Sequence, residues 1–197
     1  MIVRRTVPVV AALLLCASAA FAAGAPTPDL TTSDYKIVTS DSHYNLDTGA
    51  FTMPSKVTFY RQGTNGVADR ATGNSKNGTV TLAGHVEIHD SGNAPEAATE
   101  KAYRGSGPAT IWCDQLAVDA RAKTYDASGH VRFEQGSRNG TADHALLDRN
   151  RGILHMDGNV HLNDNGSTLS ANALDYNLNT KDVDIHGAPA VITQPKR

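Results

Sequence analysis

Cysteine, aromatic residues and positive charge are all in short supply in this sequence. The two cysteines are Cys16, which lies in an apolar N-terminal run, and Cys113, so removal of that run would leave no possible internal disulfide. An exported chain without a disulfide must be held together by its core alone. Basic residues number 18 against 20 acidic ones, which does not favour a nucleic-acid surface, because phosphate binding needs a basic patch.

Helical periodicity and metal-binding spacings are also missing. No long segment repeats apolar residues at helical spacing, whereas Gly, Asn, Asp, Ser and Thr are plentiful. This composition indicates an all-β protein with many turns. The 8 histidines include none of the compact metal-binding spacings such as H-E-x-x-H. We therefore expect solvated strand histidines, no metal ion and no cofactor.

Residues 1–22 have the parts of a secretory signal peptide. Arg4 and Arg5 give a basic start, residues 7–21 are apolar, and Ala20-Phe21-Ala22 forms a small-x-small cleavage site. The apolar run is short for a transmembrane helix, so we expect cleavage and export. An uncleaved signal would instead anchor the protein in a membrane.

The rest of the chain divides into a lead, a domain and one interruption. Residues 23–33 are interpreted as a flexible lead, and residues 34–197 as a single folded domain. Residues 90–107 contain Gly92, Pro95, Gly105 and Gly107 and break the pattern of the domain, which indicates an insertion loop.

A repeated strand pattern organises this domain. In Leu154-His155-Met156-Asp157-Gly158-Asn159-Val160-His161-Leu162, apolar and polar residues alternate on either side of Gly158. Alternation with a period of two is typical of a half-buried strand, and a central glycine marks a bend, a bulge or a close backbone approach. We therefore expect one long strand that bends at Gly158.

The pattern occurs five times, with glycine or serine at each centre. A fixed period of this kind indicates a repeat architecture. The longest interval equals one 29-residue period plus 16 residues, which we assign to the insertion loop. The central positions, spaced 29, 45, 29 and 29 residues apart, are Ser55, Gly84, Gly129, Gly158 and Gly187.

A four-residue turn precedes each bent strand. Three of the turns end in glycine, which suits a left-handed residue closing the turn, and two end in lysine. Tight turns of this length join antiparallel strands, so each repeat is predicted to be a β-hairpin. The turns are 46–49, 75–78, 120–123, 149–152 and 178–181.

Five hairpins that each have one apolar face must bury those faces together. If every long strand turns a corner at its centre, the fold is all-β: a folded-over antiparallel β-jelly-roll of about five repeats of 29 residues. Such a stack keeps two free edges, which invite strand addition by another molecule. Its interior is predicted to be lined by Phe51, Met53, Val57, Phe59, Val86, Ile88, Val131, Phe133, Leu154, Met156, Val160, Leu162, Val183 and Ile185.

The recurring unit resembles a known family. The phrases Leu82-Ala83-Gly84-His85-Val86, Ala127-Ser128-Gly129-His130-Val131 and Met156-Asp157-Gly158-Asn159-Val160 are similar to those of the LptA/OstA-like and LptC periplasmic proteins of lipopolysaccharide export. The resemblance implies a β-jelly-roll in the periplasm whose inward apolar row takes the acyl chains of lipopolysaccharide or a similar amphiphile. It also implies partners: other jelly-roll transport proteins, or further copies of this chain, joined edge to edge. The cleavable signal favours the LptA-like branch.

Two other functions stay open. A structural or adhesive repeat protein would have the same hairpins around a filled core. An enzyme acting on polysaccharide would need a carboxylate cluster, but Asp119 and Asp148 align beside turns, where other repeats carry asparagine, and this fits turn chemistry. We therefore expect no enzyme. Cys113 takes a position that is otherwise alanine, so we interpret it as a small buried residue rather than a nucleophile.

Overall fold

The computed structural model describes residues 35–61, 63–91, 108–177, 179–180, 182–187 and 190–194. Within these ranges the regular elements are all β-strands, and no helix is long and apolar enough to cross a membrane. The signal peptide, the flexible lead and nearly all of the insertion loop expected from the sequence lie outside the described residues.

The strands form one sheet of 14 strands, and all its pairings are antiparallel. The long strands lie at the centre of the order and the short ones at its ends. The strands are β1 (Tyr35–Val38), β2 (His43–Tyr44), β3 (Ala50–Met53), β4 (Val57–Arg61), β5 (Thr64–Ala68), β6 (Arg70–Asn74), β7 (Thr79–Asp90), β8 (Ala109–Asp119), β9 (Thr124–Gln135), β10 (Arg138–Asp148), β11 (Ile153–Asp164), β12 (Ser167–Asn177), β13 (Val183–His186) and β14 (Val191–Thr193).

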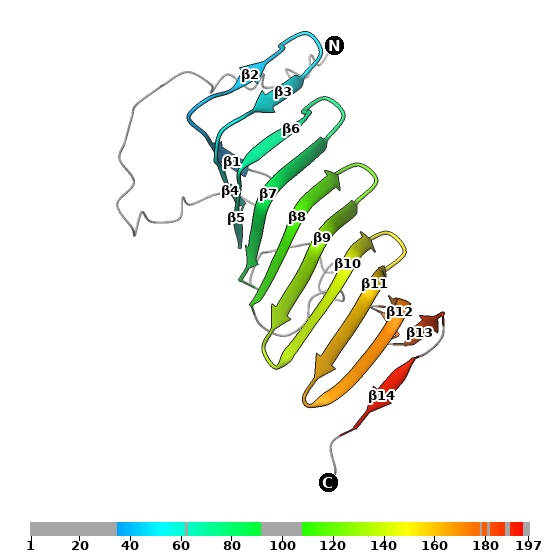
Figure 1. The fold of residues 1–197 in the computed structure, drawn as a ribbon. Coiled ribbons are helices and arrows are strands. Elements are labelled where there is room, and N and C mark those ends of the chain that lie inside the picture. The colour runs from blue at the N-terminus through cyan, green and yellow to red at the C-terminus, as the bar shows by residue number, and fades with distance from the viewer. Residues whose placement is uncertain are drawn as a thin grey trace, which may run out of the picture.

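The sheet has two arms that meet along a corner. The first half of β7 pairs with β6 and its second half pairs with β5, while the two halves of β12 pair with β13 and β14. Between these ends, β7 to β12 run continuously through both arms. Figure 1 shows them stacked in chain order, from β2 and β3 at one end to β13 and β14 at the other. The predicted folded-over stack of hairpins is confirmed.

The predicted turn chemistry is also found. The carboxylate of Asp119 accepts hydrogen bonds from the backbone N–H groups of Arg121 and Ala122, at 2.9 and 2.8 Å. Lys123 closes this turn with a φ of 55°, a left-handed geometry that costs a non-glycine residue about 1–2 kcal/mol. Asparagine or aspartate bonds the backbone of the turn in the same way at Asn45, Asn74, Asp148 and Asn177.

Two of the five expected bent strands are divided. The first is split into β3 and β4 around Pro54, because proline has no N–H to donate to the ladder. The last is split into β13 and β14, which are separated by Gly187 and the residues that follow it. The central three, β7, β9 and β11, are unbroken strands of 12 residues each.

Each corner of an unbroken strand is a β-bulge. Asp157 pairs with Ala173 and Val160 pairs with Ala171, so two residues of β11 lie opposite one residue of β12. Those two residues, Gly158 and Asn159, have φ values of 70° and 51°. Bulges bend a strand and increase its twist. The bend therefore comes from two consecutive left-handed residues rather than from the glycine alone.

The core follows the corner. The aliphatic residue after each bulge is buried, as with Val86, Val131 and Val160 at 1%, 3% and 0% exposed. The cross-strand partners of these aliphatic residues are small. Two layers that meet at a corner leave little room for large side chains on both layers. These small buried residues are Ala68, Cys113, Ala142 and Ala171.

Candidate functional site

The inward apolar row expected from the sequence is a continuous face of the sheet. Six of its members are buried, namely Phe51, Val57, Val86, Val131, Met156 and Val160. Seven are partly exposed, namely Met53, Phe59, Ile88, Phe133, Leu154, Leu162 and Ile185. The remaining member, Val183, is 39% exposed, because it lies on the edge strand β13, which has a neighbour on one side only.

Burial along this face falls with distance from the corner. In β11, Met156 and Val160 flank the bulge and are 1% and 0% exposed, whereas Leu154 and Leu162, farther out, are partly exposed. The core cluster contains residues from both arms, so the arms face each other across the interior. The interior is therefore filled at the corner and less completely covered towards the strand ends.

A shallow hollow of about 340 Å³ lies over β10, β11 and β12, away from the corner. Its lining mixes apolar Leu162 and Leu169 with polar Thr141, His161 and Ser170. Since polar and apolar residues alternate between the two sides of a strand, this lining belongs to both sides of the sheet. The hollow shares Leu162 with the inward apolar row, and its other apolar residue, Leu169, packs against the same core cluster. We place the candidate site on the row as a whole.

Among the buried residues of the described core, Cys113 is the one with a titratable side chain. Its side chain is 4% exposed, as expected for a position that is otherwise alanine. Burial raises the pKa of its thiol to about 11, and the neighbouring Asp114 carboxylate contributes to the rise. The group is therefore a protonated thiol at neutral pH and lacks the thiolate that a nucleophile needs.

The corner carries polar pairs that the sequence reasoning missed. Asp69 accepts a hydrogen bond from His85 at 2.7 Å, and Asp114 accepts one from His130 at 2.8 Å. Asn159 donates to Asp143 at 2.7 Å in the next repeat. In each pair the acid precedes its partner by 16 residues, and this spacing is the signal that would have found them.

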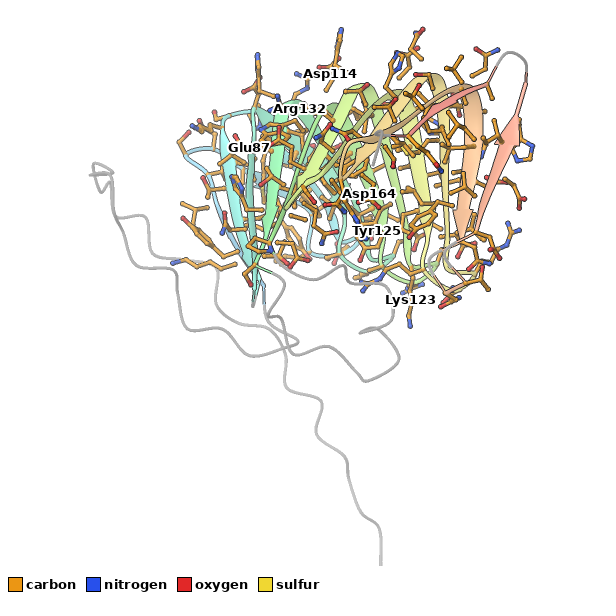
Figure 2. The ribbon with its side chains drawn as sticks, turned by 90° about the horizontal axis from the view of Figure 1, so that it is seen from below. Glu87, Asp114, Lys123, Tyr125, Arg132 and Asp164 are labelled. Carbon is orange, nitrogen blue, oxygen red and sulfur yellow. The ribbon has the colours of Figure 1, made fainter. Side chains whose placement is uncertain are left out.

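These pairs lie on the outer surface of the bend. The side chains of His85 and His130 are 92% and 91% exposed, and Figure 2 shows Asp114 and the turn residue Lys123 at opposite ends of the view. The hydrogen bond to Asp69 raises the pKa of His85, and that to Asp114 raises the pKa of His130. These histidines are therefore not merely solvated, as the sequence suggested, but hold the bulge residue against the adjacent strand.

The two ends of the sheet expose apolar side chains. At the N-terminal end, Tyr44 and Leu46 are 39% and 82% exposed, and at the C-terminal end Val191 and Ile192 are 56% and 63% exposed. Their strands or turns lie at the ends of the pairing order, where backbone N–H and C=O groups have no neighbouring strand on one side among the described residues. Both ends therefore combine apolar surface with unpaired backbone.

Sequence comparison gives two family matches. The profile of the family described as "LptA/(LptD N-terminal domain) LPS transport protein" matches residues 67–182. The profile of the family described as "Lipopolysaccharide-assembly, LptC-related" matches residues 26–91. The first match takes in the hairpins from β6 to β12, and the second ends one residue after β7.

Individual proteins are similar over different shares of the chain. The LPS-assembly protein LptD of Shewanella frigidimarina is 38% identical over 61 residues, which are 31% of this chain and 8% of that protein. The chain thus matches a small part of that relative. The crystal structure of LptH, the LptA homologous periplasmic component of the lipopolysaccharide transport device from Pseudomonas aeruginosa, shares 9% identity at a TM-score of 0.38, covering 85% of this chain and 100% of that one.

The first family profile extends over more than half of the chain and coincides with the unbroken, bulged strands that form the corner. The resemblance noted in the glycine-centred phrases is therefore confirmed. The chain belongs to the family of LptA and LptD N-terminal domain LPS transport proteins.

Proposed function

We propose that this protein shields the acyl chains of lipopolysaccharide, or of a similar amphiphile, inside the folded sheet during transfer through the periplasm. The observation that carries the proposal is the fall in burial along the inward row, from 0% at Val160 to partly exposed side chains at Leu154 and Leu162. Apolar surface left accessible on a concave face is where an apolar ligand gains most from binding.

The chemistry of the row supports an acyl ligand over a polar one. The described core contains no buried polar or charged side chain. A sugar or phosphate group would need hydrogen-bonding partners there, because burying an unpaired polar group is unfavourable. Acyl chains need no such partner, so the polar part of the amphiphile would stay outside the sheet.

Site-specific photo-crosslinking tests this proposal. A crosslinking residue at Phe133 or Leu162, both inward and partly exposed, is expected to capture lipopolysaccharide in living cells. The matched controls are Arg132 and His161, each an exposed neighbour on the same strand that points to the opposite side. Capture at the control positions alone would show that lipid does not enter the interior.

A structural or adhesive repeat protein is the competing function. It would have a core filled along its whole length, so purified protein would take up no lipid and its stability would not respond to lipid. We expect instead that purified protein extracts an acyl-labelled lipopolysaccharide from micelles. Substituting Phe133 with Asp should abolish extraction, and substituting the adjacent Arg132 with Asp should not.

We propose that the protein acts by binding and not by catalysis. The aligned aspartates already have structural partners: Asp119 bonds its own turn, and Asp114 bonds His130. Neither arrangement places two carboxylates on opposite sides of a substrate cleft, as glycoside hydrolysis requires. A test for release of reducing sugar from polysaccharide is expected to be negative, and a positive result would restore the enzyme hypothesis.

We further propose that the free edges pair with other transport jelly-rolls or with further copies of this chain. The support is the exposed apolar surface of β14, where Val191 and Ile192 are 56% and 63% exposed. Substituting Ile192 with Lys places a charge on this edge and should reduce concentration-dependent assembly in analytical ultracentrifugation. The control is Thr141→Lys, at an exposed position in the middle of the sheet. Equal assembly of both variants would exclude the C-terminal edge.

A further inference from the structure

A connected row of histidines and aspartates crosses the outer face of the sheet from β9 to β13. Neighbouring members are joined by contacts of 2.6–3.4 Å. The row lies on the side opposite the core, since its members alternate along their strands with buried residues such as Ala145, Met156 and Leu174. In order of contact, it consists of Asp126, His144, Asp157, His155, Asp175 and His186.

Proton counting at His144 fixes its charge in this arrangement. Its Nδ1 lies 2.9 Å from Asp157 Oδ2, and its Nε2 lies 2.9 Å from Asp126 Oδ1. An ionised carboxylate only accepts hydrogen bonds, and a neutral imidazole has one N–H to donate. Both contacts can be hydrogen bonds only when the ring carries two protons.

His155 repeats this arrangement one strand further on. Its Nδ1 lies 2.6 Å from Asp175 Oδ1, and its Nε2 lies 3.4 Å from Asp157 Oδ2. Asp157 therefore lies between two imidazole rings, and each ring lies between two carboxylates. Loss of the second proton from either ring would turn a nitrogen lone pair towards a carboxylate oxygen.

The last contact of the row reaches the edge of the sheet. His186 of β13 lies with its Nε2 3.2 Å from Asp175 Oδ2. The strand β13 has four residues and pairs with β12 alone. Its own Asp184 is the cross-strand partner of Asp175, and like charges directly opposite each other destabilise strand pairing. On this face of the described strands, the side-chain contact of His186 with Asp175 joins β13 to β12.

The titration of His144 has a definite sign. Hydrogen bonding to Asp157 raises the pKa of His144, with Asp126 adding to the rise and partial burial opposing it. A raised folded-state pKa gives stability that is complete below the unfolded-state value and is lost as pH rises through the folded value. The carboxylates facing the histidines come from β9, β11, β12 and β13, and they are Asp126, Asp157, Asp175 and Asp184.

We propose that this row is a proton-dependent clamp that holds the edge strand β13 on the sheet. When His144, His155 and His186 are protonated, they neutralise the carboxylates between which they lie. When they lose that charge, the carboxylates repel one another and β13 detaches. Residues 173–176 of β12, which pair with β13, then become an open edge that is available to another strand. The clamp acts whatever the interior binds.

Hydrogen exchange followed by mass spectrometry tests the clamp on the full chain. Exchange of the β13 amides is compared at about pH 5.5 and about pH 8.5, on either side of the ordinary imidazole pKa, after correction for intrinsic rates. Protection of β13 should fall about tenfold or more at the higher pH. Protection of β7 should change much less.

Three variants separate the clamp from general loosening. A triple variant, H144Q, H155Q and H186Q, should have low β13 protection that no longer depends on pH. Asp157→Asn keeps an acceptor and supplies a donor, so it should keep the fold while reducing the pH dependence. His161→Gln is the matched control, because His161 lies on β11, as His155 does. Its Nδ1 lies 2.8 Å from the hydroxyl oxygen of Ser170 and not from a carboxylate. This control should keep the full pH dependence.

Two results would overturn the proposal. One is equal β13 protection at the two pH values in the unsubstituted protein. The other is an unchanged pH dependence in the triple variant, which would assign the effect to groups outside the row. Nuclear magnetic resonance titration of the His144 ring provides an independent check, since this ring must gain its second proton over the pH range in which β13 becomes protected.

Discussion

The ring of Phe133 on β9 lies over Gly140, its cross-strand partner on β10. A Cβ atom added to Gly140 would lie 2.9 Å from Cζ of that ring and 2.6 Å from Leu162 Cδ2. The glycine therefore provides the space in which the ring lies flat along the inner face. Phe51 and Phe59 lie over Gly73 and Gly66 in the same way.

Substituting Gly140 with Ala should destabilise the protein by overpacking. Gly140 does not have a positive φ. Its replacement by alanine therefore tests the contact with the Phe133 ring and not backbone strain. We expect a loss of about 1–3 kcal/mol in the free energy of unfolding, measured by urea denaturation. In a Phe133→Leu background the same alanine should be less costly. An equal cost in both backgrounds would show that the ring is not what the glycine accommodates.

The corner glycines should tolerate no side chain, for two separable reasons. Gly158 has a φ of +70°, and an added Cβ would lie 2.7 Å from the Cβ of Asp143. Gly158→Ala should therefore cost the left-handed strain of about 1–2 kcal/mol together with the clash. The control is Gly136→Ala, where φ is +60° and nothing lies within 4 Å of the added atom. Similar losses for both variants in thermal or urea unfolding would exclude the clash.

The fall in burial along β11 predicts unequal effects of truncation. Met156 is 1% exposed, so Met156→Ala should cost about 2–5 kcal/mol of stability. Leu154 lies on the same strand but is partly exposed, so Leu154→Ala should cost about 1 kcal/mol. Urea denaturation measures both. Equal losses would mean that the interior is closed along its whole length, which would favour the filled core of a structural protein.

The corner pair of His130 and Asp114 predicts a local pH effect. The hydrogen bond to Asp114 raises the pKa of His130, so Asp114→Ala should return that pKa towards its ordinary value. Nuclear magnetic resonance titration of the ring measures the change. The side chain of His130 is 91% exposed, so added salt should reduce the effect in the unsubstituted protein.

The sign and the control of this prediction follow from the same contacts. Because the folded-state pKa of His130 is raised, the pair stabilises the fold fully below the unfolded-state pKa and loses this effect as pH rises through the folded value. His85 keeps its hydrogen bond to Asp69 in Asp114→Ala and should retain most of its own raised pKa. A loss of equal size at both histidines would indicate a general disturbance of the corner.

The repeat, the hairpins and their turns follow from the sequence because they are local. Alternation and turn chemistry act over a few residues, and Asp119 bonds the backbone two and three residues ahead whatever the rest of the chain does. The burial of Cys113 could also be predicted from the sequence, because Cys113 aligns with alanines in other repeats. Even the break after β3 has a local cause in Pro54, although the repeat pattern alone led us to expect a continuous strand.

Only the tertiary structure decided which residues meet across strands and how far the arms are covered. The pairing of Asp114 with His130, and the row through His144 and His155, depend on a bulge that shifts the register between strands. The exposure of Val183 depends on its place at the end of the stack. Period-two alternation assigns each side chain to a face, but burial depends on the distance between facing arms, and that distance is set by all the strands together.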